Sequence, residues 1–419
     1  MGWAAVARQY AGQTTTRTAT DWRLPTAAFA LAMMTEPAIG AIVRASGSAE
    51  PAWARFFWLP VYATALPLIV TDWRGALRAL RATPLLAAAL VLALLSAFWS
   101  IAPDVTLRRA SALAMTMALG WRLARFDWSD LLRALAWAWS ALIVGGFAFA
   151  LLWPEAGVMG ADSSHPGAWS GLWTHKNMLG GMMGVGVSVL LAAALTDTAH
   201  RRRWLAFAAA ALALVVLSTS ATALLVTFAG VGVLTVGVIV RRGGPIVPVL
   251  WGAAALAAIL ATFTAAVAPD FVFAVLGRDA TLTGRTDIWS AALEAIAKRP
   301  AFGHGFGAFW SAGEGPAFWL RQALGWDVPN AHNGWLEVLL GLGWTGAALI
   351  ALQFVRSLPR VAAALADPIA GLIAPPFVAM FALMSLSEGY ILQDNSTVWV
   401  MYVAIAAKLA LKPSGKESV

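Results

Sequence analysis

Apolar runs long enough to cross a bilayer recur along almost the whole chain, and they constrain the fold more than any single motif. Each run has about 17–25 residues, which is the length that one helix needs to span the hydrocarbon core. Hydrophobic residues make up 60% of the chain and charged residues 12%, and the mean hydropathy is +0.72. These values lie far from the averages of soluble domains. The sequence therefore predicts an all-α, multi-pass membrane protein.

We expect about twelve transmembrane helices in a single membrane domain over residues 1–419. A long polar loop, residues 269–331, is inserted between the ninth and tenth helices and is expected to contain short helices. The expected ranges are 25–43, 53–70, 84–100, 108–121, 131–153, 177–195, 204–217, 221–240, 246–268, 332–354, 369–386 and 396–411. Many of the 22 Trp residues lie near the ends of these ranges, as is typical of side chains at the membrane interface.

The distribution of basic residues predicts the orientation. If the N-terminus faces the cytoplasm, the inner segments carry 19 of the 29 Lys and Arg residues and the outer segments carry 10. Cytoplasmic segments of membrane proteins are enriched in Lys and Arg. Both termini are therefore expected inside, and the loops over 154–176 and 269–331 outside.

The sequence also argues against several classes of protein. It has no cysteine, so neither a disulfide framework nor a thiolate site is expected. The first 23 residues lack the apolar core and cleavage site of a signal peptide, so the first membrane helix is expected to direct insertion. The net charge of +8 does not indicate nucleic-acid binding, because inner clusters such as Arg201–Arg203 suit anionic lipid headgroups.

The long outer loop is predicted to contain a helix that begins near Arg285. Thr286 can cap this helix, Asp287 suits its first turn, Lys298 suits its last turn, and Pro300 ends it. A guanidinium beside a helix N-terminus favours a phosphate group. We therefore interpret Arg285 as a phosphate-binding residue.

Other basic residues are candidates for the same anion. Arg278 and Arg321 lie in the same loop. Lys176, at the start of the sixth helix, is a further candidate, although a lysine at the interface can simply extend toward the headgroups. The structural alternative for Arg285 is a pairing with Asp279 or Asp287 that only holds the loop.

His332 is the candidate general base. It stands at the outer end of the tenth helix, where the helix dipole favours a neutral ring that can accept a proton. Asn330 or Asn333 can cap the helix, which leaves open that His332 is a bystander. Glu337 lies one turn deeper and is either a member of a polar network or a structural acid. No segment has the spacing of a metal site, so no metal and no cofactor is expected.

With these residues in view, the chain resembles the O-antigen ligase and polymerase superfamily of bacterial surface-polysaccharide enzymes. It is most similar to members associated with exopolysaccharide polymerisation. The motifs cover about residues 170–345, and the expected helix pattern extends the resemblance to the whole chain. The motifs are His175–Gly180, Gly284–Arg285 with Trp289, Gly303–Phe309, and His332 with Gly343.

The resemblance implies a metal-independent membrane glycosyltransferase of the bacterial inner membrane. Such enzymes transfer glycan from undecaprenyl diphosphate to a hydroxyl group at the periplasmic face. The acceptor is lipid A-core in ligases and another lipid-linked repeat unit in polymerases. Arg285 would hold the diphosphate and His332 would take the acceptor proton. Other polysaccharide assembly proteins are further expected partners, and nucleic acid is not.

The chain departs from the family pattern at one turn. Family members commonly place an Arg or Lys at the turn where this chain has Ala221 and Thr222. Three explanations are open. Lys176, Arg278 or Arg321 replaces that cation, the alignment slips, or activity is altered or lost.

Two other classes of protein fit the same helix pattern. A lipid-linked oligosaccharide flippase or transporter should line a central cavity with deep charges, whereas few ionisable residues lie at membrane depth here, among them Glu36, Glu337 and Glu388. A non-catalytic component of a polysaccharide export complex is the third interpretation, which the missing cation near Ala221 keeps open.

Overall fold

The computed structural model describes residues 22–37, 39, 56–161, 163, 165–242, 285–311, 315–325 and 328–411. In these ranges the chain is helical, and the one β-type pairing found there is a single bridge between Val158 and Trp169. The predicted all-α class is confirmed. The expected ninth helix, 246–268, lies outside the described residues.

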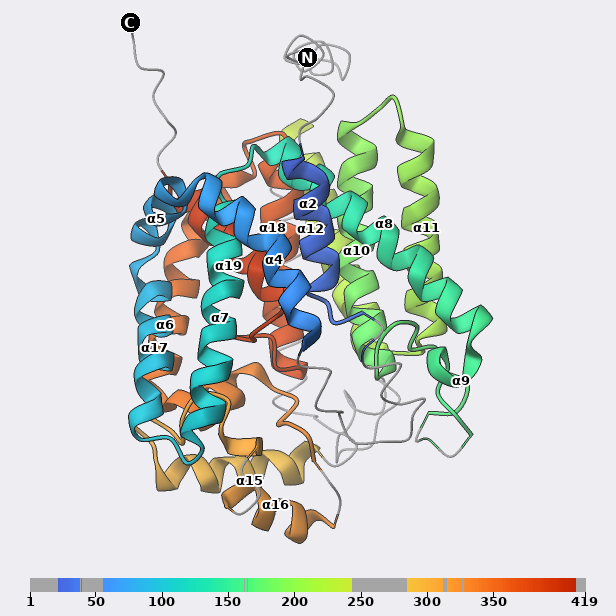
Figure 1. Ribbon diagram of the computed structural model, residues 1–419. Helices are drawn as coiled ribbons and strands as arrows, with labels where there is room; N and C mark the ends of the chain where they lie inside the picture. The colour runs from blue at the N-terminus through green and yellow to red at the C-terminus, as the bar shows by residue number, and fades with distance from the viewer. Residues whose placement is uncertain are drawn as a thin grey trace, which may run out of the picture.

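The long helices of the described ranges form one bundle (Figure 1). Short 3₁₀ helices, η2 (Ser96–Phe98) and η4 (Phe309–Ser311), stand between longer elements. The α-helices are α2 (Arg23–Met33), α4 (Trp58–Thr71), α5 (Trp73–Ala82), α6 (Pro84–Leu95), α7 (Pro103–Leu123), α8 (Trp128–Leu152), α9 (Pro154–Gly157), α10 (Lys176–Thr196), α11 (Arg201–Leu217), α12 (Ala221–Arg242), α15 (Arg285–Lys298), α16 (Pro316–Leu324), α17 (Gly334–Ala364), α18 (Ala370–Ser387) and α19 (Thr397–Ala410).

By length and hydropathy, five of the described helices can cross a membrane: α8, α10, α12, α17 and α18. A sixth crossing results if α5 and α6, which meet at an angle of 98°, count as one broken span. This criterion supports a multi-pass membrane protein but does not reach the expected count of about twelve. Helix α10 is the most buried of the five. Its glycines allow close approach of neighbouring helices, which is the usual way in which membrane helices pack.

The first expected helix, 25–43, is interrupted after Met33, and residues 38 and 40–43 lie outside the described residues. Helix α2 ends at Met33, and residues 34–37 form a turn in which Glu36 has a φ of 55°. Pro37 explains this end, because a proline has no N–H to donate and disfavours a helical conformation in the residue before it. The expected inner segment 71–83 is also more ordered than predicted. It contains α5, whose start is capped by the Asp72 carboxylate, which accepts from the Gly75 N–H at 3.2 Å.

Helix α17 is interrupted at Gly343, and the interruption fixes the outer loop. Gly343 has a φ of 64°, which is accessible to glycine and strained for other residues. Beside it, the Trp344 N–H donates to the Pro300 carbonyl at 2.8 Å, and the His304 N–H donates to the Leu340 carbonyl. A Cβ on Gly303 would lie 2.5 Å from the Gly341 backbone. The glycine-rich motif Gly303–Phe309 is therefore packed directly on α17.

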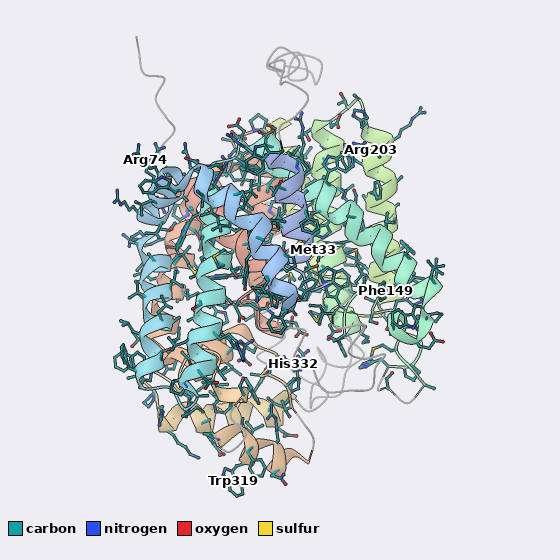
Figure 2. All side chains as sticks on the ribbon, viewed as in Figure 1. Met33, Arg74, Phe149, Arg203, Trp319 and His332 are labelled. Atoms are coloured by element: carbon teal, nitrogen blue, oxygen red, sulfur yellow. The ribbon has the colours of Figure 1, made fainter. Side chains whose placement is uncertain are left out.

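The two ends of the bundle differ in character. Helices α15 and α16, from the loop over 269–331, lie at one end (Figure 1). His332 lies toward that end, whereas Arg74 and Arg203 lie at the opposite end (Figure 2). We call the end with His332 the site end. The predicted short helices of the loop are thus observed in its described part.

Candidate active site

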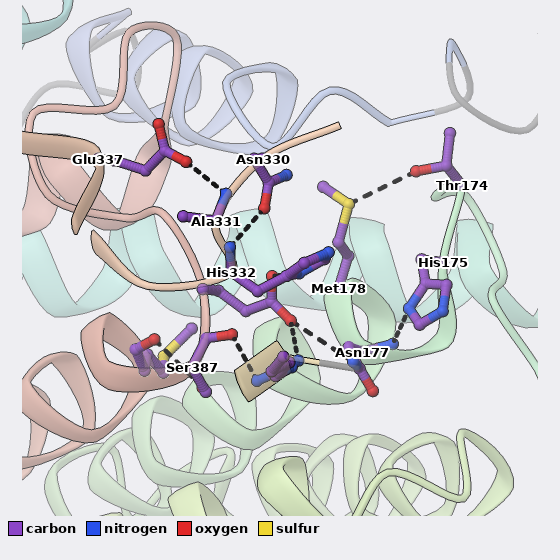
Figure 3. A network of polar contacts seen from close by, with 12 residues as sticks. Thr174, His175, Asn177, Met178, Asn330, Ala331, His332, Glu337 and Ser387 are labelled. Atoms are coloured by element: carbon purple, nitrogen blue, oxygen red, sulfur yellow. Dashed lines mark hydrogen bonds and ion pairs between the residues drawn. The ribbon is translucent and has the colours of Figure 1, made fainter. Parts of the chain in front are cut away.

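Four separate elements bring polar side chains together at the site end (Figure 3). Arg285 is the first residue of α15, and His332 lies just before α17. Glu388 follows the last residue of α18, and Asn177 is in the first turn of α10. Each residue stands at a helix end, where side chains of a membrane bundle can reach one another without crossing its apolar core.

Glu388 is the centre of this cluster. Its carboxylate lies 3.0 Å from His332 Nδ1 and 3.4 Å from Arg285 Nη2. It also accepts from Asn177 Nδ2 at 3.4 Å. Burial raises the pKa of the Glu388 carboxyl, but the hydrogen bond and charge of His332, followed by the charge of Arg285, outweigh burial and bring this pKa below its ordinary value. Glu388 is therefore an anion at neutral pH. We call Glu388, His332, Arg285 and Asn177 the Glu388 network.

Arg285 is held by two acceptors from α18. Its Nη1 donates to the Ser387 carbonyl at 3.1 Å, and its Nη2 faces Glu388. A cation at a helix C-terminus is favourable because the last carbonyls of the helix lack partners there. The predicted position just ahead of a helix is confirmed to within one residue. A carboxylate at the end of another helix, Glu388, thus pairs with Arg285, and Asp279, one of the local partners considered from sequence, lies outside the described residues.

His332 is placed by a strained backbone. Its φ is 48°, in the left-handed region that is rare for residues other than glycine. Its N–H donates to Asn330 Oδ1 at 2.8 Å. Asn333 caps α17, with Oδ1 accepting from the N–H groups of Trp335 and Leu336. The two asparagines therefore do shape the turn, and the same turn directs the His332 ring at Glu388. Strain of this kind persists only where the surrounding structure enforces it.

A second cation lies beside the Glu388 network. The side chain of Lys176 is directed at the turn between α11 and α12, where Nζ donates to the Thr219 carbonyl at 3.1 Å. The same turn supplies Ser220, whose hydroxyl donates to Asn177 Oδ1 at 2.9 Å. Asn177 thus connects this turn to Glu388. The polar contacts in Figure 3 also include His175, whose Nδ1 accepts from the Asn177 N–H at 3.3 Å and caps α10.

His175 is kept neutral by its surroundings. Burial is the main cause that lowers its pKa to about 4, and the charges of His165, His332 and Lys176 act in the same direction. Glu388 opposes them. A neutral ring is also what the cap requires, because Nδ1 can accept from the Asn177 N–H only while it carries no proton.

Glu337 has a different set of partners. Both of its oxygens accept from Trp310 Nε1 at 3.0 Å, and Oε1 accepts from the Ala331 N–H at 2.6 Å. Arg321 lies nearby and donates to the Val328 carbonyl at 3.0 Å and the Trp310 carbonyl at 3.1 Å. These contacts hold residues 328–333, the strap that carries His332. We call Glu337, Trp310, Arg321 and Ala331 the Glu337 network.

The structure thus brings some of the predicted residues together and separates others. Arg285 and His332 meet through Glu388, and Lys176 lies next to them. Arg321 is directed at the backbone of its own loop, and Arg278 lies outside the described residues. Sequence reasoning did not choose Glu388. The signal for it was that Glu388 is one of few ionisable residues at membrane depth.

Fold and site together define a multi-pass helical membrane protein with ionisable side chains gathered at one end of its bundle. Residues 205–351 match the family described as O-antigen ligase. Over 312 residues the chain is 26% identical to the exopolysaccharide production protein ExoQ of Rhizobium meliloti (strain 1021), covering 71% of this chain and 70% of that relative. These matches confirm the resemblance to the O-antigen ligase and polymerase superfamily, and they support a role as a membrane polysaccharide ligase or polymerase.

Proposed function

We propose that this protein is a glycosyltransferase that moves glycan from undecaprenyl diphosphate to a hydroxyl group. The observation that carries the proposal is the contact of one carboxylate, Glu388, with both Arg285 and His332. The Arg285 guanidinium suits the diphosphate of the donor, because a planar fork of N–H donors matches phosphate oxygens. The imidazole beside it suits the proton of the acceptor hydroxyl.

In the proposed reaction the acceptor oxygen attacks the anomeric carbon of the donor glycan. The bond between that carbon and the diphosphate oxygen breaks, and its electron pair leaves with undecaprenyl diphosphate. His332 takes the hydroxyl proton on Nε2. Glu388 keeps Nδ1 as the donor nitrogen of the ring and stabilises the positive charge that the ring gains. Arg285 stabilises the negative charge that develops on the leaving diphosphate.

Lys176 is proposed to supply the cation that is missing at the turn near Ala221. Its Nζ lies 3.1 Å from the Thr219 carbonyl, so its positive charge already stands at this turn. We expect Lys176→Ala to lower transfer by about tenfold, the effect of losing one charge-assisted contact. Adding Ala221→Arg to Lys176→Ala should restore part of the lost rate. Arg321→Ala is the contrasting variant: its loss should come from the strap that carries His332, so adding Ala221→Arg should not restore it, and restoration there would contradict this assignment.

The proposed orientation places the site end in the periplasm and both termini in the cytoplasm of an inner-membrane protein. The support is the position of Arg74 and Arg203 at the end opposite His332 (Figure 2), because basic residues favour the cytoplasmic side. The count of about twelve crossings is part of this proposal, because apolar runs of spanning length recur along the sequence.

The experiment that tests the function is product analysis in a deletion strain, combined with turnover by the purified protein. The name of the relative in Rhizobium meliloti favours an exopolysaccharide, so we expect deletion to halt a secreted polymer at single repeat units. Accumulation of unligated O-antigen would indicate the ligase reaction instead. Translocation of lipid-linked glycan by the purified protein without any new glycosidic bond would indicate a flippase and contradict the proposal.

A further inference from the structure

An apolar groove runs between α2 and α8, away from the Glu388 network. Its volume is about 620 Å³, and all of the residues that line it are apolar. They include four alanines, Ala28 and Ala32 of α2 and Ala138 and Ala141 of α8. Phe29 and Trp137 also line it, and each is about half exposed, at 47% and 49%. Because the alanines have small side chains and Phe29 and Trp137 have large ones, the surface is hollow where α2 contacts α8.

The groove extends along the height of the bundle. On α2 it is lined from Leu24 to Met33, which corresponds to about 14 Å at 1.5 Å per residue. At one end Trp137 contacts Arg203, whose guanidinium carbon lies 5.0 Å from the ring centroid. Met33 lies between the level of Arg203 and the level of His332 (Figure 2). The groove therefore leads from the end of the bundle with Arg74 and Arg203 toward the site end.

At the site end the groove adjoins the segment that enters α10. Pro37 and Leu172 line it there. The next residue, Trp173, is buried, and its Nε1 donates to the Thr35 carbonyl at the end of α2 at 2.6 Å. Two residues further on, His175 caps α10 and Lys176 begins it. Three residues of chain thus separate Leu172 of the groove from Lys176, and the hydrogen bond of Trp173 fixes this segment to the end of α2.

We propose that this groove holds the polyprenyl chain of the donor, an inference that rests on the proposed function. The donor of that reaction has an apolar chain that must stay in the hydrocarbon region while its diphosphate lies at the interface. A groove with a wholly apolar lining, beside the membrane-spanning helix α8, that ends at Leu172, four residues before Lys176, meets both requirements. It would favour a long branched chain over a short one, because a longer chain covers more of the apolar lining.

The test uses a polyprenyl diphosphate with a photoreactive diazirine in its chain and no sugar, bound to the full-length protein in nanodiscs. We expect labelled peptides from α2 and α8. Excess unlabelled polyprenyl diphosphate should suppress the labelling, and the same excess of phosphatidylglycerol should not. Ala141→Phe, which fills the groove at an exposed position, should lower labelling about tenfold, the effect of losing contact with about two methylene groups. Ala209→Phe, at an exposed alanine of α11 outside the groove, is the matched control and should change nothing.

Labelling spread evenly over the membrane surface of the protein, or labelling that Ala141→Phe leaves unchanged, would overturn the proposal. Equal suppression by phosphatidylglycerol would show a general lipid groove and would overturn it too. Transfer of glycan is measured separately on the same wild-type sample. If transfer is absent but labelling in the groove is specific, the proposed function fails and the binding site stands. If transfer is present without labelling in the groove, only the groove proposal fails.

Discussion

Two partly buried carboxylates contact the strap that carries His332, and their other partners differ. Glu388 contacts two ionisable side chains, Arg285 and His332. Glu337 accepts from the indole N–H of Trp310 and from the backbone N–H of Ala331. The strap itself is further fixed by Trp289, whose Nε1 donates to the Ala331 carbonyl at 2.9 Å.

The comparison shows how two carboxylates can have different roles because their partners differ. A carboxylate that faces an imidazole and a guanidinium can set the tautomer and charge of those groups, as a reaction requires. A carboxylate that faces N–H donors of an indole and the backbone satisfies those donors and fixes their position. We therefore assign chemistry to the Glu388 network and the position of His332 to the Glu337 network.

The largest effect is expected at the two residues that would contact substrate. His332→Ala and Arg285→Ala should each abolish polymer or ligated glycan in cells, while the protein stays in the membrane at normal abundance. In the purified protein, loss of a general base lowers the rate by about 10²–10⁴-fold. Polymer of wild-type length and yield from His332→Ala would show that His332 is not the base.

Glu388→Gln should have the next largest effect. The substitution keeps the shape of the side chain but removes the charge that supports His332 and Arg285. We expect kcat to fall by about 10- to 100-fold, as for other partners that orient a reacting ring. The thermal midpoint of the purified protein serves as the control and should change little. An unchanged kcat in this variant would show that Glu388 does not take part in the proposed reaction.

Glu337→Gln should have the opposite result, with a larger effect on stability than on kcat. An amide in place of the carboxylate presents an NH₂ group toward donors that need an acceptor, so the strap is less well held. We expect a loss of about 1–3 kcal/mol in the free energy of unfolding, seen as a lower thermal midpoint. The loss of kcat should be smaller than for Glu388→Gln. If Glu337→Gln is folded as well as the wild type but inactive, the distinction between the two networks is wrong.

The smallest expected effect concerns pH and His175. Its pKa of about 4 in the folded protein lies below its ordinary value of 6.5. The unfolded chain therefore binds more protons between these two values, so stability is lost as pH falls from about 6.5 to about 4. His175→Asn keeps a side chain that can cap α10 and removes the titrating ring. Its thermal midpoint should depend less on pH in this window, and an unchanged pH dependence would contradict the assignment.

Part of this site is predictable from the sequence. The polar stretch between apolar runs marks the end of the bundle where Arg285 and His332 lie, and their order relative to helix starts follows from capping signals. These features are predictable because they depend on local sequence: Arg285 lies in the polar loop, and His332 directly follows it. The break in α17 was not predicted, because the expected helix over 332–354 runs through Gly343.

The partners of these residues were not predictable in the same way. Glu388 comes from the end of another helix, 56 residues after His332, and only the packing of α17 against α18 brings them together. Arg321 has the charge of a phosphate ligand, but two backbone carbonyls of its own loop hold it. Glu337 was interpreted as a member of a polar network or a structural acid, and its contacts with Trp310 and Ala331 fit both descriptions. Such contacts depend on tertiary packing, which one sequence does not display.

A double-mutant cycle on kcat tests most directly whether Glu388 acts through His332. His332→Ala, Glu388→Gln and the double variant are compared with the wild type for release of polyprenyl diphosphate by purified protein in nanodiscs. If the two residues form one unit, the double variant will be about as slow as His332→Ala alone, because the carboxylate has no ring left to orient. Losses that simply multiply would show that the two side chains act independently and would contradict the account.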